Sequence, residues 1–249
     1  MFSRKPSTSK WLTGVAIVLS GTLSGAALAQ EPDPRVLLNR MATEIAGLDS
    51  FILSGDAYAD ARLDAGQIIE NSMQATMRVR RPDAMRLTIR NDEGIKELVF
   101  GSGVLTLYTE KDQFYAQTEI PEGIGAAVKV AIDDVGIDAP LLDFLSDNPA
   151  EQLLLDAQEV RLLGVSLIRG KMYEQIAIRK SEIDIQIWIA SEGPALPGKM
   201  TISSKWESGS PRFVVFLDWD TDPDLPTGAV SFDPPANATK IEFLLDQER

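Results

Sequence analysis

The sequence predicts a mainly β (α+β) protein built on a single, strongly curved antiparallel sheet of about ten or eleven strands, partly closed over helices. Apolar and polar residues alternate along most of the chain, which is typical of strands with one buried face. Helical spacing occurs in only two main stretches, one before the strands and one between two runs of strands. Strand runs with so few helices between them indicate an antiparallel sheet.

The first helix is predicted to begin at Asp33-Pro34, a cap followed by proline at the first helical position. Apolar residues then recur at helical spacing until Gly47 ends the pattern. The residues of this stripe are Leu37, Met41, Ile45 and Leu48. From Phe51 the period is two, and the predicted strands cover 73–80, 85–90, a hairpin at 95–109 around Gly101-Ser102-Gly103, and 114–119.

A helical insert is predicted where this first run of strands ends. Pro121 begins it, Gly136 ends it, and a short apolar helix follows at 140–145. Its apolar stripe consists of Ile124, Val128, Ile132 and Val135. Strands then resume, most clearly at 183–189 and 213–219. Since no repeat or composition break divides the chain, we expect one domain over residues 30–249.

The composition excludes several kinds of chemistry. The 249 residues include no His and no Cys, which removes imidazole bases, thiol nucleophiles and the zinc sites built on either. The 24 lysines and arginines face 37 acidic residues, and a net charge of -13 opposes a nucleic acid as partner. No G-x-S-x-G segment is present, so no nucleophile elbow is expected. We expect neither an enzyme nor a cofactor.

The N-terminus has the features of a secretory signal peptide. Arg4, Lys5 and Lys10 precede an uncharged apolar run that ends in Ala27-Leu28-Ala29. A basic start, a short apolar run and an Ala-x-Ala site predict cleavage after Ala29, with an uncleaved anchor as the alternative. No later stretch reaches the ~18 apolar residues of a membrane span. We therefore expect a periplasmic protein, soluble after removal of residues 1–29.

Three segments carry a resemblance to a known superfamily. They are the basic and proline-containing step at 79–87, the glycine-turn hairpin at 98–108, and Phe232-Asp233-Pro234-Pro235. All three resemble the periplasmic carriers of outer-membrane lipoproteins, the LolA-like superfamily. The chain is more similar to a family of predicted periplasmic proteins of unknown function within it. The positions that match that family's pattern are Asp33-Pro34, Arg81-Pro82, Leu107-Tyr108, Tyr115-Ala116 and Ala139-Pro140.

This resemblance implies an open half-barrel with the helices as a lid over an apolar cavity. It implies a lipid or the acyl chain of a lipoprotein as ligand, so the expected partners are a lipid or an acylated protein. The alternative is a protein-interaction or envelope-stress sensing module, with an envelope protein as partner and a core filled by its own side chains. The residues that we expect to line the cavity or its lid are Met77, Val79, Met85, Leu87, Ile89, Ile124, Val128 and Ile132.

Arg81 is the one charged residue that we expect at this site. Continued alternation along the strand would place Arg81 on the apolar face with Met77 and Val79, and Pro82 favours a strand end there. The resemblance implies that Arg81 hydrogen-bonds the helical lid. If the chain bulges at Pro82, Arg81 instead extends to water.

A calcium site is the remaining candidate. Asp218, Asp220, Asp222 and Asp224 alternate, as at the start of a calcium-binding loop. However, Pro223 stands at the glycine position of such a loop and Ala229 at the closing glutamate. The sequence therefore predicts no metal site.

Overall fold

The computed structural model of the chain describes residues 33–64, 66–120, 123–137, 139–206 and 209–243. The predicted signal peptide, residues 1–29, lies outside the described residues and stays a prediction. Pro121, where the second helical pattern begins, lies outside them as well.

The first helix has the predicted boundaries. α1 (Pro34–Ala46) begins after Asp33, whose carboxylate accepts a hydrogen bond from the backbone N–H of Arg35 at 2.9 Å. Gly47 caps its other end. Leu37, Met41 and Ile45 are buried, as their helical spacing predicts.

Six strands follow before the insert, and each pairs with the next by a hairpin. They are β1 (Ser50–Arg62), β2 (Ile68–Arg80), β3 (Ala84–Asn91), β4 (Gly94–Gly101), β5 (Val104–Thr109) and β6 (Phe114–Glu119). The predicted glycine-turn hairpin is confirmed as β4–β5. Its two turn residues, Ser102 and Gly103, have φ values of 54° and 72°, the conformation that a two-residue hairpin turn requires.

The insert contains one helix more than predicted. α2 (Ile124–Asp133) and the 3₁₀ helix η1 (Pro140–Leu145) match the expected elements. α3 (Pro149–Leu154) was not predicted, although Asn148 caps it and Pro149 stands at its first position. Six residues are too few for an apolar periodicity to be visible.

The second run of strands completes the sheet. It consists of β7 (Glu159–Ile168), β8 (Lys171–Arg179), β9 (Ile183–Ala190), β10 (Pro197–Ser204) and β11 (Arg212–Asp220). After η2 (Thr227–Ala229), β12 (Thr239–Ile241) pairs in parallel with β6. The described residues thus form 12 strands, and the predicted ten or eleven is corrected mainly by this three-residue strand, which is too short to show a pattern.

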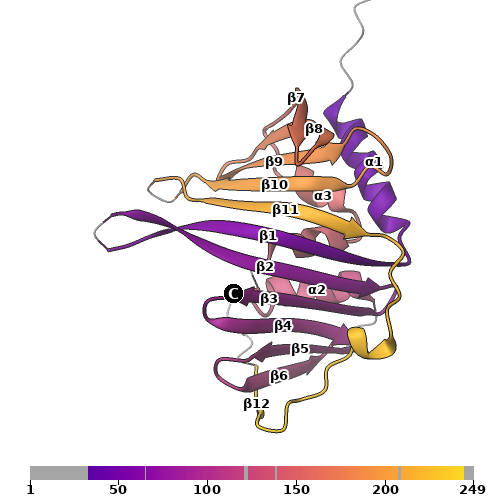
Figure 1. Cartoon of the computed structure of the whole chain (residues 1–249), viewed down its shortest axis with the longest axis vertical. Helices are drawn as coiled ribbons and strands as arrows, with labels where there is room; N and C mark the ends of the chain where they lie inside the picture. The colour runs from indigo at the N-terminus through magenta and orange to yellow at the C-terminus, as the bar shows by residue number, and fades with distance from the viewer. Residues whose placement is uncertain (1–32, 65, 121–122, 138, 207–208, 244–249) are drawn as a thin grey trace, which may run out of the picture. The chain divides into compact units, whose positions relative to one another are not determined.

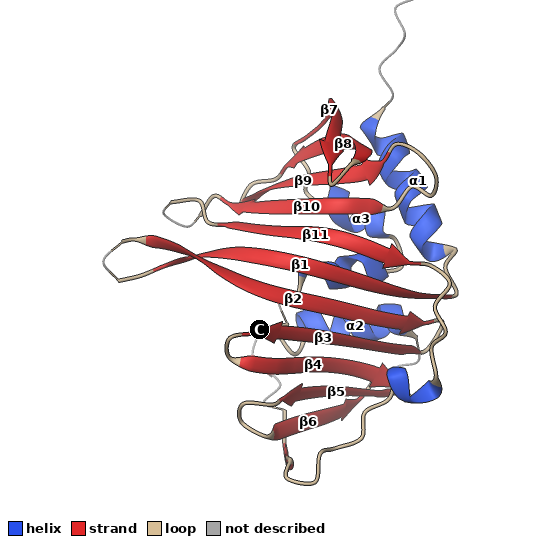
Figure 2. Ribbon diagram, in the orientation of Figure 1, coloured by secondary structure: helices blue, strands red, loops and turns tan. Residues whose placement is uncertain are grey.

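One sheet contains all these strands, in the order β12-β6-β5-β4-β3-β2-β1-β11-β10-β9-β8-β7 (Figure 1). β1 joins the two runs because it pairs with β11 as well as with β2. β7 and β12 form the two edges, so the sheet is an open half-barrel, as predicted. The helices of the insert lie across one face of the sheet, which we call the inner face (Figure 2).

The core lies between the inner face and the helices. Phe51 of β1 and Phe144 of η1 both contact Trp219 of β11, with ring centroids 5.3 and 6.2 Å apart. Met77, Val79 and other alternate residues of the strands join the same cluster. Burial of this apolar surface is the main force that holds the insert on the sheet.

The opposite, outer face carries the C-terminal segment. Phe232 lies between Tyr108 and Tyr115, with ring centroids 5.6 and 5.5 Å from theirs. The C-terminal segment therefore crosses β5 and β6 before β12 adds to the edge.

Candidate ligand-binding groove

A groove of about 650 Å³ opens between the insert and the ends of five strands. Its volume is within the range of small-molecule sites in proteins. The strands β1, β2 and β9–β11 form one wall, and the end of α2 with the start of η1 forms the other. The larger apolar side chains of its lining are Met73, Ile132, Ile137, Ile183, Ile202 and Phe213.

Local structure explains why these side chains meet. Ile202 of β10 pairs directly with Phe213 of β11, and Ile183 begins β9 on the same face. On the other wall, Gly136 has a φ of 72°, and the following Ile137 donates its N–H to the carbonyl of Ala131 at 2.9 Å. This left-handed turn directs the chain back after α2, so Ile137 contributes to the groove.

The groove has a charged rim. The Asp60 carboxylate accepts a hydrogen bond from the backbone N–H of Arg212 at 3.0 Å, and the Arg212 guanidinium lies 3.6 Å away. Both residues line the groove. Asp60 and Arg212 therefore pair with each other, and Asp143 of η1 is a third charged residue of the lining.

The predicted site residues divide between the groove and the core. Met77, Val79 and Met85 have an exposed fraction of 0%, and Leu87 one of 2%. Ile124 and Val128 of α2 are buried in the same cluster. Ile89 is half-buried against this core, and only Ile132 of the predicted set lines the groove. The protein's own helices thus cover most of the apolar strand face that the alternation predicts, and most of the expected cavity residues belong to the core.

Sequence reasoning missed most groove residues. Met73, Ile183 and Phe213 lie in predicted strands. However, the periodicity does not indicate which ends of these strands the helices leave uncovered. Trp206, whose exposed fraction is 67%, also lines the groove. The signal available in the sequence is a tryptophan in the loop region between two predicted strands.

Arg81 lies in a turn, not in a strand. β2 ends at Arg80, so Arg81 lies one residue beyond the strand. The Arg81 N–H donates to the carbonyl of Asp49 at 2.8 Å, and Asp49 lies directly opposite Arg81 in the register that pairs Ser50 with Arg80. The carbonyl of Pro82 accepts a hydrogen bond from the N–H of Ile124 at 3.1 Å. This turn therefore anchors the first residue of α2.

The Arg81 side chain is half-buried near the insert. Burial lowers the pKa of its guanidinium, and the nearby carboxylate of Asp147 offsets part of that effect. Asp147 in turn lies against Gly125 of α2, at a point where any Cβ would collide with the carboxylate. The Arg81 Nε has no hydrogen-bond partner among the described residues. Arg81, Asp147 and the first turn of α2 thus meet at one end of the insert.

Two of the alternating aspartates contact other residues of the chain. Asp218 pairs with Arg169, and Asp220 accepts a hydrogen bond from the backbone N–H of Asp222 at 3.3 Å. Within the described residues, no group of three or more carboxylates is placed to hold a metal ion. Nor does any helix of this part of the chain have the length and apolar character needed to cross a bilayer.

An open antiparallel sheet with a helical insert on its inner face and an apolar groove beside it defines an open half-barrel class of protein. The family model described as "Predicted periplasmic protein (DUF2092)" matches residues 35–244, and the chain belongs to this family. The predicted periplasmic localisation is thereby confirmed. A comparison with curated proteins finds no match.

The chain is also similar to solved structures at low sequence identity. An uncharacterized conserved protein from Thermus thermophilus is 10% identical, with a TM-score of 0.50 over 84% of this chain and 98% of that one. The Mycobacterium tuberculosis lipoprotein LppX is 13% identical, with a TM-score of 0.45 over 78% and 98%. A LolA superfamily protein from Nitrosomonas europaea is 10% identical, with a TM-score of 0.40 over 80% and 97%.

Proposed function

We propose that the protein binds an apolar ligand, a lipid or the acyl chain of a lipoprotein, in the groove and performs no catalysis. The observation that supports this proposal is the groove itself, about 650 Å³ with a predominantly apolar lining, directly beside a filled core. Each Å² of apolar surface removed from water contributes about 25 cal/mol, so an alkyl chain gains affinity without directed contacts. Of the three charged residues of the lining, Asp60 and Arg212 pair with each other at the rim, and Asp143 of η1 is the third.

Fluorescent fatty-acid binding tests this proposal. A carboxylate in the groove would place a charge against its apolar wall, so Ile137→Glu should weaken the probe at least tenfold. Leu155→Glu is the matched control, because Leu155 is exposed and does not line the groove. Equal affinity in the native protein and Ile137→Glu would contradict the proposal.

One observation favours the alternative function, a protein-interaction or sensing module. The side chains expected to line a cavity are buried under the insert, so the core is largely filled by the protein itself. Absence of saturable binding by any fatty-acid or phospholipid probe would favour this alternative.

A further inference from the structure

β7 is an unpaired edge of the sheet. Among the described residues it pairs only with β8, whereas the opposite edge, β12, has three residues. β7 has 10 residues. At about 3.3 Å per residue it therefore presents an edge of roughly 33 Å. An edge of this length is a ready template for pairing with another chain.

The hairpin turn determines which backbone groups of β7 are free. Arg169 and Gly170 form the turn between β7 and β8, with φ values of 47° and 80°. In such a two-residue hairpin the flanking residues, here Ile168 and Lys171, are hydrogen-bonded to each other. Because the ladder alternates, Val165 and Leu167 direct their N–H and C=O groups away from β8.

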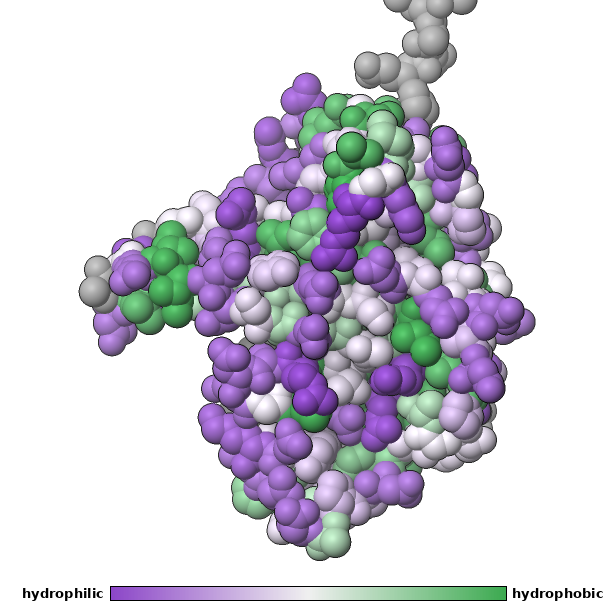
Figure 3. Space-filling view, in the orientation of Figure 1, coloured by the Kyte–Doolittle hydropathy of each residue, from purple (hydrophilic) through white to green (hydrophobic). Residues whose placement is uncertain are grey.

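The side chains of these same positions are apolar and exposed. The exposed fractions are 51% for Leu163, 58% for Val165 and 69% for Leu167. Met172, which pairs with Leu167, is also exposed. Figure 3 shows hydrophobic surface over the β7–β8 end of the molecule. Edge strands are usually protected by charges, prolines, bulges or short length. β7 has a register shift between Leu162 and Gly164, and the stretch from Val165 to Ile168 beyond it contains no charge and no proline.

Positive charge stands at both ends of this apolar stretch. At one end, Arg161 and Arg179 share a single carboxylate, Glu159, at 3.5 and 3.1 Å. At the other end, Lys171 forms no ion pair with the described carboxylates. Each end therefore presents one cation without a carboxylate of its own, while the neighbouring Arg169 at the Lys171 end binds two, Asp56 and Asp218. The net charge of the whole chain is -13. Interactions between exposed charges more than about 8 Å apart are largely screened at physiological salt. The charge of a segment that binds at this edge is therefore selected by the nearby cations more than by the net charge of the chain.

We propose that β7 binds an extended segment of another protein as an additional strand. The segment is apolar at alternate positions and acidic at both ends, with its two acids about seven or eight residues apart. Backbone groups of Val165 and Leu167 supply the hydrogen bonds, and Leu163, Val165 and Leu167 contact the apolar side chains. This edge lies on β7, which contributes nothing to the lining of the groove, so the inference does not rest on lipid binding.

A second copy of the chain fits this edge less well. Antiparallel pairing of two β7 strands would place the Arg161 end of each against the Lys171 end of the other, which brings cationic ends together. The net charge of -13 on each copy adds repulsion at longer range.

The test uses a fluorescein-labelled peptide, Asp-Thr-Val-Thr-Val-Thr-Val-Thr-Asp, and a matched probe with Asn at both ends. Protein purified from the periplasm should bind the acidic probe saturably and more tightly than the Asn probe, with a preference that falls as salt rises. Val165→Pro removes one outward N–H and leaves the β8 ladder intact, so it should weaken both probes about tenfold. Val165→Thr keeps the N–H and should bind as the native protein does.

Arg161→Gln combined with Lys171→Gln should abolish the preference for the acidic probe. If Val165→Pro fails to fold by circular dichroism, this charge variant decides, and an unchanged preference would overturn the proposal. Equal binding by a folded Val165→Pro protein would also overturn it. A concentration-dependent dimer that Val165→Pro dissociates would identify a second copy as the occupant instead. A fatty-acid probe should not compete with the peptide, which separates this outcome from that of the groove.

Discussion

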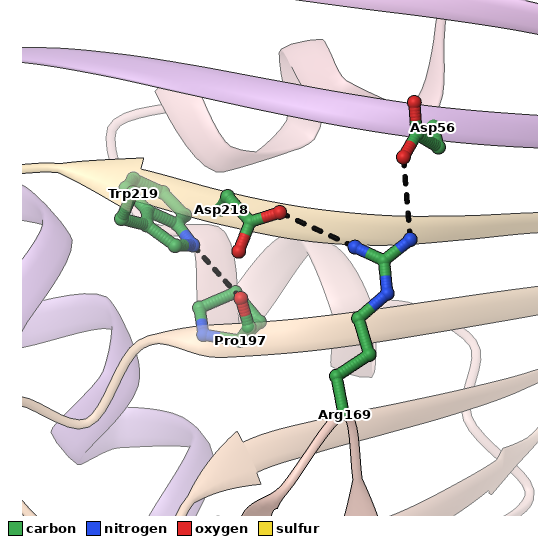
Figure 4. Close-up of polar contacts among 5 residues, drawn as sticks. All are labelled: Asp56, Arg169, Pro197, Asp218 and Trp219. Carbon is green, nitrogen blue, oxygen red and sulfur yellow. Dashed lines mark hydrogen bonds and ion pairs between the residues drawn. The ribbon is translucent and has the colours of Figure 1, made fainter.

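Arg169 and Asp56 join segments that lie 113 positions apart, with Nη2 and Oδ2 at 3.2 Å (Figure 4). Arg169 stands in the turn of the β7–β8 hairpin, and Asp56 belongs to β1. The same guanidinium contacts Asp218 of β11 at 3.2 Å and lies 4.5 Å from the ring centroid of Phe216. The Arg169 side chain therefore connects the β7–β8 hairpin to β1 and β11 on the outer face of the sheet.

Arg169→Asn should loosen this hairpin, because both ion pairs and the ring contact are lost while Asn still tolerates a positive φ. The pairs are half-exposed, so we expect a loss of only about 1 kcal/mol in unfolding free energy. Hydrogen exchange of residues 159–179 should accelerate. Arg169→Lys keeps the charge and should show a smaller effect; unchanged exchange in Arg169→Asn would refute the fastening role.

Gly198→Ala should destabilise the protein by about 1–3 kcal/mol, because the ring of Tyr173 occupies the space that a Cβ would need. Thermal unfolding of the variant measures the loss. Gly228→Ala is the control, since no atom lies within 4 Å of the added Cβ. Tyr173→Ala combined with Gly198→Ala should cost less than the sum of the single changes. A Gly198→Ala protein as stable as the Gly228→Ala control would contradict the expected collision.

Arg81→Leu should preserve the fold and change the insert. Loss of the guanidinium leaves Asp147 without its nearby charge, so we expect faster hydrogen exchange in residues 123–137 and an altered affinity for a fatty-acid probe. Arg80→Leu is the neighbouring control, because Arg80 is the last residue of β2 and lines a separate pocket together with Asp83 and Val99. If exchange and affinity match those of the native protein, Arg81 has no role in the lid.

Lys199 should make stability depend on pH. Burial, and secondarily Arg212, lower its pKa below 10.5, while the ammonium lies 4.4 Å from the ring centroid of Trp188. Between the lowered pKa and 10.5 the unfolded chain binds more protons at this residue than the folded chain, so stability rises with pH there. Below this window Lys199 is charged in both states, and folding bears the full cost of burying that charge.

Lys199→Met removes the titrating ammonium group. Urea unfolding between pH 7 and about pH 11 should therefore show the native protein gaining stability relative to Lys199→Met as pH rises. Lys240→Met, at an exposed position, should run parallel to the native protein. If the difference in unfolding free energy between the native protein and Lys199→Met stays constant with pH, burial does not lower the pKa of Lys199.

Local chemistry accounts for the elements that the sequence predicted well. Asp33-Pro34 begins α1, and Gly101-Ser102-Gly103 closes the β4–β5 hairpin, because caps and tight turns depend on a few adjacent residues. β7 was not located by its pattern. A register shift between Leu162 and Gly164 breaks the alternation, and a bulge of this kind depends on the neighbouring strand.

The candidate site shows the same division. From alternation alone, Met77, Val79, Met85 and Leu87 were correctly assigned to the buried face, since any apolar row on a strand must leave water. Whether a ligand or the protein's own helices cover that row depends on where the insert lies on the sheet. α2 lies over it, so these residues form core.

The sequence by itself determined the class of fold, the α1 boundaries and the inward face of most strands, because periodicity and capping are local properties. Only the tertiary structure decided that Ile183, Ile202 and Phe213 meet Ile137 in a groove and that β7 remains an edge. The physical reason is that burial depends on the relative positions of segments far apart in the chain. An alternation of apolar and polar residues shows which face of a strand is buried, but it does not show where that strand lies relative to distant segments.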